Sequence, residues 1–205
     1  DRELCEYQYL GDRVVTQRRH PSATGWSPNL YSVYSLPPEQ VDHIETVIFG
    51  RVDQDAANAL DALINNRALR AGNEINGWSR FIMSLLFRNP PALDVIKAEV
   101  QQKWSEMEWS PEAQQADPQG YAEWLLGEES FHFGDLFATS VRNVCDMPLI
   151  GQILNNMHKG VLEIRKPGYR FMTSDNPLYV SGGLGAPNAH ILLPLTPFKL
   201  YIAST

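Results

Sequence analysis

The spacing of apolar residues changes once along the chain, from every third or fourth position before Gly160 to every second position after it. The first spacing matches the turn of an α-helix and the second matches a β-strand. The helical pattern predicts a long helix over residues 39–66, a second over 74–87 and a third that begins at Pro90-Pro91. Gly72-Asn73 separates the first two.

Prolines modify the rest of the helical region. Two prolines and a glycine in residues 110–120 predict a loop, and a short helix is expected over residues 121–129. A further helix is expected over residues 134–158, interrupted or kinked by Pro148, because proline lacks the N–H that an inner turn needs.

Strand-like runs lie at both ends of the chain. Two short runs around Gly11-Asp12 predict an N-terminal hairpin. After Gly160 the expected strands cover residues 161–165, 169–172, 178–180, 190–195 and 198–203. Helices followed by strands favour an α+β fold in which the helical middle segment packs on an antiparallel or mixed sheet. We expect a single domain over residues 1–205, made of a hairpin and aromatic loop (1–38), a helical region (39–158) and a β-rich region (160–205). The missing initiator Met and the strand-like end predict a fragment of a longer chain.

Composition narrows the function classes. The net charge of −7 disfavours a broad nucleic-acid surface, because an acidic surface repels phosphates. No apolar run approaches the roughly 18 residues of a membrane span, so no membrane partner is expected. Cys5 and Cys145 have no metal-binding spacing, and we expect two inert, at least partly buried thiols in a reducing compartment, the cytoplasm.

The densest candidate site is the segment from Thr173 to Pro177. Asp175 and Asn176 side chains can bond nearby backbone N–H groups, which gives a rigid turn. The same groups, with the Ser174 hydroxyl, could instead form a polar site at a strand end, as a β-hairpin with Pro194-Leu195-Thr196-Pro197 would present it. The Ser-Asp-Asn triplet of penicillin-recognising enzymes is excluded, because no Ser-x-x-Lys accompanies it.

Other polar residues have weaker signals. Arg88 ends an apolar helix, where it complements the helix dipole or forms a bidentate pair with a carboxylate such as Asp175. His190 precedes a strand near Gly182-Gly183-Leu184-Gly185, a segment that only faintly resembles a phosphate loop. Side chains that could bind a metal ion are most closely spaced in the sequence at Glu128, Glu129, His132 and Asp135. They fit an acidic helix end better than a metal site, and any metal or other cofactor stays unknown.

Three motifs in order resemble one family. They are the helix end Phe87-Arg88-Asn89-Pro90, the strand end Thr173-Ser174-Asp175-Asn176-Pro177 and the late Pro194-Leu195-Thr196-Pro197. Together they are similar to the bacterial family of domain of unknown function 4238, over nearly the whole chain. That family usually opens with a His-x-x-Pro segment, which this sequence lacks. The resemblance implies a shared fold and supplies no reaction.

Two functions remain open. The first is a hydrolase acting on a phosphate-containing or nucleic-acid substrate, in which Asp175, Asn176, Ser174 and Arg88 are the catalytic residues. Asp175 would be the general base or a metal ligand, and Arg88 would hold an anion. The second is a non-catalytic folding or interaction module of a larger protein, in which the turn is only structural. The partner is an unknown small molecule or nucleic acid, and the oligomeric state is open.

Overall fold

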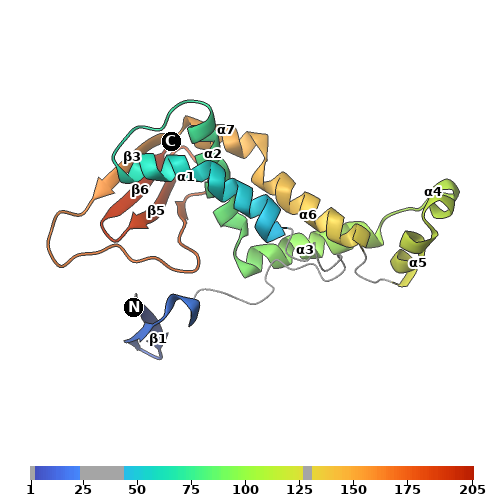
Figure 1. Ribbon diagram of the computed structural model, residues 1–205, viewed down its shortest axis with the longest axis horizontal. Coiled ribbons are helices and arrows are strands. Elements are labelled where there is room, and N and C mark those ends of the chain that lie inside the picture. Colours follow the sequence, from blue (N-terminus) through green and yellow to red (C-terminus); the bar gives the residue numbers. More distant parts are fainter. Residues whose placement is uncertain (1–2, 24–43, 127–130) are drawn as a thin grey trace. The chain divides into compact units, whose positions relative to one another are not determined.

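The computed structural model describes residues 3–23, 44–126 and 131–205, and the chain divides into two units, Asp1–Leu30 and Tyr31–Thr205. Each unit is described by itself, and the predicted single domain stays a prediction. The predicted α+β fold is confirmed, with an N-terminal hairpin, a helical middle and a C-terminal antiparallel sheet (Figure 1).

The first unit contains the predicted hairpin. Strand β1 (Leu4–Leu10) pairs antiparallel with β2 (Arg13–Arg19), and a 3₁₀ turn follows at Pro21–Ala23. Gly11 has a φ of +66°, which a glycine adopts without the steric cost of a Cβ. Most of the hairpin side chains are exposed, Cys5 among them, so the prediction that both thiols are at least partly buried is wrong for this one.

The second unit begins with helices. They are a π-helical turn (Ile44–Phe49), α1 (Gly50–Ile64), α2 (Asn73–Phe87), α3 (Pro90–Ser105), α4 (Pro111–Ala116), α5 (Pro118–Leu126), α6 (Phe131–Cys145) and α7 (Pro148–Asn156). The start of α3 is as predicted, and the Asn89 side chain caps it by accepting from Ala92 N at 2.9 Å. The expected start of the first helix, residues 39–43, lies outside the described residues.

Prolines begin helices where a loop or a kink was expected. The loop predicted over residues 110–120 is wrong, because Pro111 and Pro118 occupy first helical positions of α4 and α5. A proline is well placed there, since the first N–H groups of a helix have no intrahelical partner. Ser110 and Asp117 cap the two helices by accepting from Ala113 N and Gly120 N. Pro148 likewise begins α7, so the helix predicted over 134–158 is two helices.

The sheet contains strands β3 (His158–Glu163), β4 (Tyr179–Ser181), β5 (His190–Thr196) and β6 (Lys199–Ser204). Its order is β3-β6-β5-β4, and every neighbouring pair is antiparallel. The strand expected over residues 169–172 is absent from the described structure, because Phe171 N donates to Pro197 O in the β5–β6 turn and the segment pairs with no strand. The polar turn therefore lies in the connection between β3 and β4 rather than in a hairpin.

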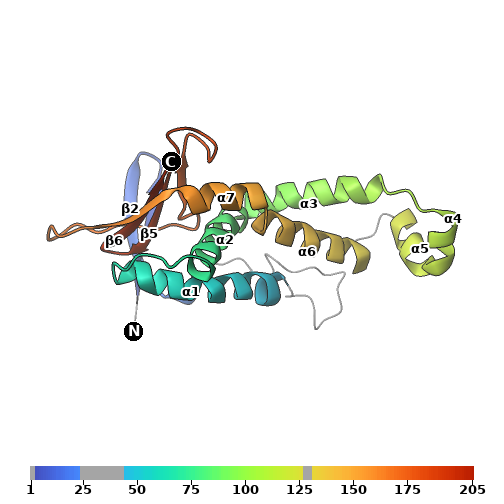
Figure 2. The same ribbon diagram turned by 90° about the horizontal axis from the view of Figure 1, so that it is seen from above.

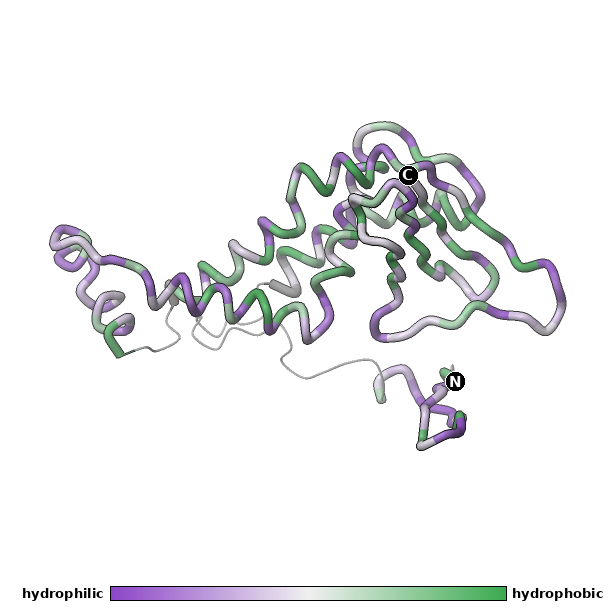
Figure 3. The backbone as a smooth tube through the Cα atoms, turned by 180° about the vertical axis from the view of Figure 1, so that it is seen from behind, coloured by the Kyte–Doolittle hydropathy of each residue, from purple (hydrophilic) through white to green (hydrophobic). Residues whose placement is uncertain are grey.

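The core of this unit lies between the sheet and helices α1, α2 and α7. Helix α1 lies over the strands in both ribbon views (Figures 1 and 2). Alternate residues of β5 and β6 are buried with Ala59 and Leu63 of α1 and Trp78 of α2. The rings of Trp78 and Tyr201 meet edge to face, with centroids 5.2 Å apart. Hydrophobic and hydrophilic positions alternate along the helices (Figure 3), as burial of one face requires.

Helices α1 and α2 approach each other closely at Gly77. A Cβ built on Gly77 would lie 2.7 Å from the backbone oxygen of Asp55, closer than the 3.0 Å below which Cβ contacts essentially do not occur. Only glycine fits this crossing without a shift of the backbone. The close approach therefore fixes the distance between α1 and α2 at this crossing.

Candidate functional site

The predicted polar turn bonds to itself. The Ser174 hydroxyl donates to Asn176 O at 2.8 Å and accepts from Asn176 N at 3.2 Å. Asn176 N also donates to Asp175 Oδ1 at 3.1 Å. All three residues are exposed. These bonds are the ones expected for a capped turn, which was the structural interpretation of this segment. A catalytic role of the three side chains stays a prediction.

Arg88 binds a different carboxylate from the one expected. Its guanidinium donates to both oxygens of Asp53, at 2.7 and 3.2 Å, and lies 4.4 Å from the centre of the Phe49 ring. Asp53 lies in the first turn of α1 and Arg88 follows α2, so the pair joins the start of one helix to the end of the next. Within the described residues, Asp175 forms no ion pair with Arg88, and their joint role stays a prediction.

The weaker candidates are dispersed. His190 Nδ1 lies 3.4 Å from the Ser181 hydroxyl on the exposed end of the β4–β5 pair. Glu128 and Glu129 fall outside the described residues, as does the side chain of His132. Among the residues that the structure does describe, no three His, Cys, Asp or Glu side chains are grouped to hold a metal ion.

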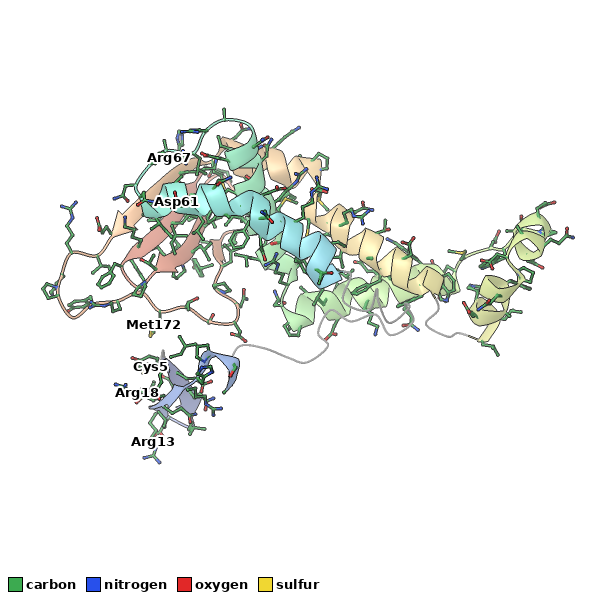
Figure 4. All side chains as sticks on the ribbon, viewed as in Figure 1. Cys5, Arg13, Arg18, Asp61, Arg67 and Met172 are labelled. Carbon is green, nitrogen blue, oxygen red and sulfur yellow. The ribbon has the colours of Figure 1, made fainter. Side chains whose placement is uncertain are left out.

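An open groove of about 870 Å³ lies beside β3, and we call it the β3 groove. It lies between β3, the end of α7 and the connection from α1 to α2, on which Figure 4 labels Arg67. Its lining residues are Leu63, Asn66–Leu69, Ile75, Asn155, Met157–Glu163 and Arg165. The permanent charges among them are the cations Arg67, Lys159 and Arg165 and the single carboxylate of Glu163.

An ion pair holds the wall formed by the α1–α2 connection. Arg67 donates two bonds of 2.9 Å to Glu74, and Arg70 N donates to the same carboxylate at 2.7 Å. The bonds from Arg67 first, and then the one from Arg70 N, lower the pKa of Glu74 to about 2. Bidentate pairing fixes the plane of the guanidinium and balances its charge with that of Glu74.

Two lysines contact helix ends beside the groove. Lys159 Nζ donates to Asn155 O at 2.8 Å and to Met157 O at 3.0 Å, and its burial lowers its pKa. Lys199 Nζ, on β6, donates to Ile64 O at the end of α1 and to Asn66 Oδ1. A cation at these carbonyls complements the helix dipole, and both contacts tie the sheet to the helices around the groove.

A polar chain continues from the groove into the helix packing. The Asn155 amide donates to Asn76 Oδ1 at 2.9 Å, and the buried Ser79 hydroxyl donates to Asn155 Oδ1 at 2.7 Å. Because buried polar groups are costly when unpaired, these bonds fix α7 against α2. The network therefore holds Asn155, a lining residue, in a fixed position.

No sequence motif marks the residues that line the groove. Arg67, Lys159 and Arg165 come from distant parts of the chain, and none lies in a motif or a charged run. The only local cue is that Lys159 directly precedes the alternating run of β3. Packing of α1 and α7 against the sheet brings these residues together, so periodicity alone does not find the groove.

The comparisons with known proteins identify the family of the chain. The family model described as "Protein of unknown function (DUF4238)" matches residues 1–204. No curated protein and no solved structure matches the chain. No helix of the described residues is both long enough and apolar enough to cross a membrane. The match confirms the resemblance drawn from the three sequence motifs.

Proposed function

The chain belongs to the DUF4238 family, whose description assigns no function, and we propose from its geometry that it is a non-catalytic interaction module that binds an anionic partner in the β3 groove. The observation that carries the proposal is the charge of this groove. Three cations and one carboxylate line it, on a chain whose net charge is −7. Arg67 is paired with Glu74, so Lys159 and Arg165 against Glu163 give the groove its positive charge. A local positive site on an acidic protein attracts anions selectively, because the rest of the surface repels them.

Fixed side chains support binding. Arg67 is oriented by its pair with Glu74, and Lys159 is held by two carbonyl oxygens. Groups that are ordered before binding lose less conformational entropy when a partner arrives. Arg165, by contrast, is exposed at the end of the groove, where it is available to a partner.

The hydrolase predicted from the polar turn is the competing hypothesis. It needs Ser174, Asp175, Asn176 and Arg88 to act on one substrate. The hydrogen bonds of Ser174, Asp175 and Asn176 lie within their own turn. Arg88 binds Asp53 and so joins α1 to the end of α2. We therefore place the interaction module first and keep the hydrolase as the alternative to be tested.

Binding is tested with two labelled anionic probes, a decapeptide of alternating glutamate and valine and a ten-nucleotide single-stranded DNA. Fluorescence anisotropy follows each probe with the wild type, Arg165→Ala and Arg142→Ala. Arg142 is an exposed arginine of α6 outside the groove, so its variant removes the same charge. We expect Arg165→Ala to weaken binding of at least one probe about threefold or more, and Arg142→Ala to leave it unchanged. Absence of binding to both probes, or equal losses in both variants, would overturn the proposal.

Catalysis is tested on the same preparation with p-nitrophenyl phosphate, bis-p-nitrophenyl phosphate and a labelled RNA. Wild type and Asp175→Ala are compared, and their melting temperatures are measured alongside. We expect no turnover above that of the variant. Hydrolysis that disappears in Asp175→Ala at an unchanged melting temperature would establish the hydrolase instead.

A further inference from the structure

The β3 groove contains an unpaired strand edge. Ile164 N donates to Phe198 O at 2.9 Å, which sets the phase of the β3–β6 pairing. Because the two edges of a strand alternate residue by residue, Gly160 and Leu162 also bond towards β6. The backbone N–H and C=O groups of Lys159, Val161 and Glu163 then point away from β6, into the groove. Within the described ranges these outward groups have no backbone partner.

Among the residues that the structure describes, the opposite edge of the sheet is protected by its short strand, whereas β3 has no such protection. Strand β4, at the other end of the strand order, has only three residues, and very short edge strands resist pairing with other chains. Strand β3 has six residues and contains neither a proline nor a register shift. A lysine on an edge strand often prevents pairing, but the Lys159 ammonium is turned back onto the carbonyls of Asn155 and Met157.

The charge of the groove selects the occupant. Arg67 lines the groove on the α1–α2 connection, but its charge is balanced by Glu74. Lys159 and Arg165 are lining cations that form no ion pair among the described residues, and Glu163 is the one lining carboxylate. Two cations against one carboxylate favour glutamate or aspartate over basic side chains on an extended chain paired with β3.

We propose that an extended acidic segment of a partner protein adds to β3 as a further strand of the sheet. The inference rests on the proposed function and specifies its partner and its mode of binding. Main-chain hydrogen bonds to the outward groups of Lys159, Val161 and Glu163 provide affinity, as in other cases of strand addition. The exposed Arg165 at the end of β3 selects acidic sequences. An oligonucleotide would use the same cations but could not form the strand ladder.

Amide hydrogen exchange of the whole chain, measured by NMR with the alternating glutamate–valine decapeptide, tests the ladder directly. In the free protein the amides of Lys159, Val161 and Glu163 exchange faster than those of Gly160 and Leu162. Saturation with the peptide slows the first three at least tenfold and changes the other two little. A matched lysine–valine decapeptide produces no such protection.

Two variants at one position separate the backbone from the side chain. Val161→Pro removes an outward N–H, which edge strands tolerate, whereas Val161→Ala keeps the N–H and removes most of the side chain. We expect Val161→Pro to bind the acidic peptide about tenfold more weakly than Val161→Ala. The proline removes one main-chain hydrogen bond to the peptide, and its ring would contact the peptide backbone. Circular dichroism of both variants establishes that they are folded, and the exchange measurement on the wild type decides the question if one is not.

The outcomes distinguish the two proposals. Peptide binding that depends on Arg165 without protection of the outward amides overturns strand addition and leaves the anion-binding module standing. Binding of DNA but not of the peptide has the same meaning. Failure of both anionic probes overturns both proposals. Equal protection by the acidic and the basic peptide overturns the selection by charge.

Discussion

Replacement of Gly77 by alanine tests the helix crossing that supports the whole second unit. The added Cβ would lie 2.7 Å from Asp55 O and 3.0 Å from the carbonyl carbon, both backbone atoms that cannot rotate away. Such overpacking costs about 1–3 kcal/mol, and the better helix propensity of alanine offsets up to about 1 kcal/mol of it. We expect Gly77→Ala to lower the free energy of unfolding by about 1–2 kcal/mol.

Gly151 is the matched control, because it lies within helix α7 and a Cβ there meets no atom within 4 Å. Gly151→Ala should raise the free energy of unfolding by about 0.4–1 kcal/mol, through the lower entropy of the unfolded chain. The two variants should therefore differ by about 2 kcal/mol, or about 4–8 °C in melting temperature for a chain of this length.

Urea unfolding followed by tryptophan fluorescence measures both variants, since the buried Trp78 directly follows Gly77. Equal m-values would show that the two variants expose the same surface on unfolding. If Gly77→Ala were as stable as Gly151→Ala, α1 and α2 would not approach as closely as the Asp55 contact requires. The Gly77 contact would then not hold together the two helices that the groove wall connects.

Three further expectations follow from the side chains. The folded pKa of Glu74 is about 2 against an ordinary value of 4.5, so its stabilising contribution is complete above pH 4.5 and is lost as the pH falls towards 2. The difference in melting temperature between the wild type and Glu74→Gln should therefore shrink over that pH range. A difference that stays constant would contradict this expectation. Burial raises the pKa of Cys145 to about 11, so Ellman's reagent at pH 8 should titrate the exposed Cys5 at once and Cys145 only after unfolding, and two fast thiols would contradict the fold. A double-mutant cycle between Arg88 and Asp53 should give a coupling of about 1 kcal/mol by urea unfolding, whereas additive effects would refute the pair as a stabilising contact.

The sequence predicted elements best where one local signal dominated. The turn at Gly11-Asp12 predicts the N-terminal hairpin, and Asn89 before Pro90 predicts the start of α3. The prediction from the sequence was wrong where one residue type is compatible with two structures. Pro111 and Pro118 indicate either a loop or the first position of a helix, and only the caps from Ser110 and Asp117 distinguish the two.

The candidate site was harder to predict because its parts meet only in the folded chain. The bonds within the Ser174–Asn176 turn are local, and their residue types predict them. The choice of Asp53 over Asp175 by Arg88 depends instead on the crossing of α1 and α2. The cations of the groove depend on the position of β3 beside the α1–α2 connection, which no local pattern contains.

The order of the strands has a consequence for folding kinetics. Strand β6 is the last in the sequence, yet it separates β3 from β5, and Tyr201 is paired with Val161 on one side and Leu193 on the other. The β5–β6 hairpin closes a short loop and can form early, whereas β3 must join across a long connection at a higher entropic cost. We therefore expect β3 contacts to form after the rate-limiting step, so that weakening them accelerates unfolding and leaves the folding rate nearly unchanged. The strand with the open edge would then be the last part of the sheet to assemble and the first to detach.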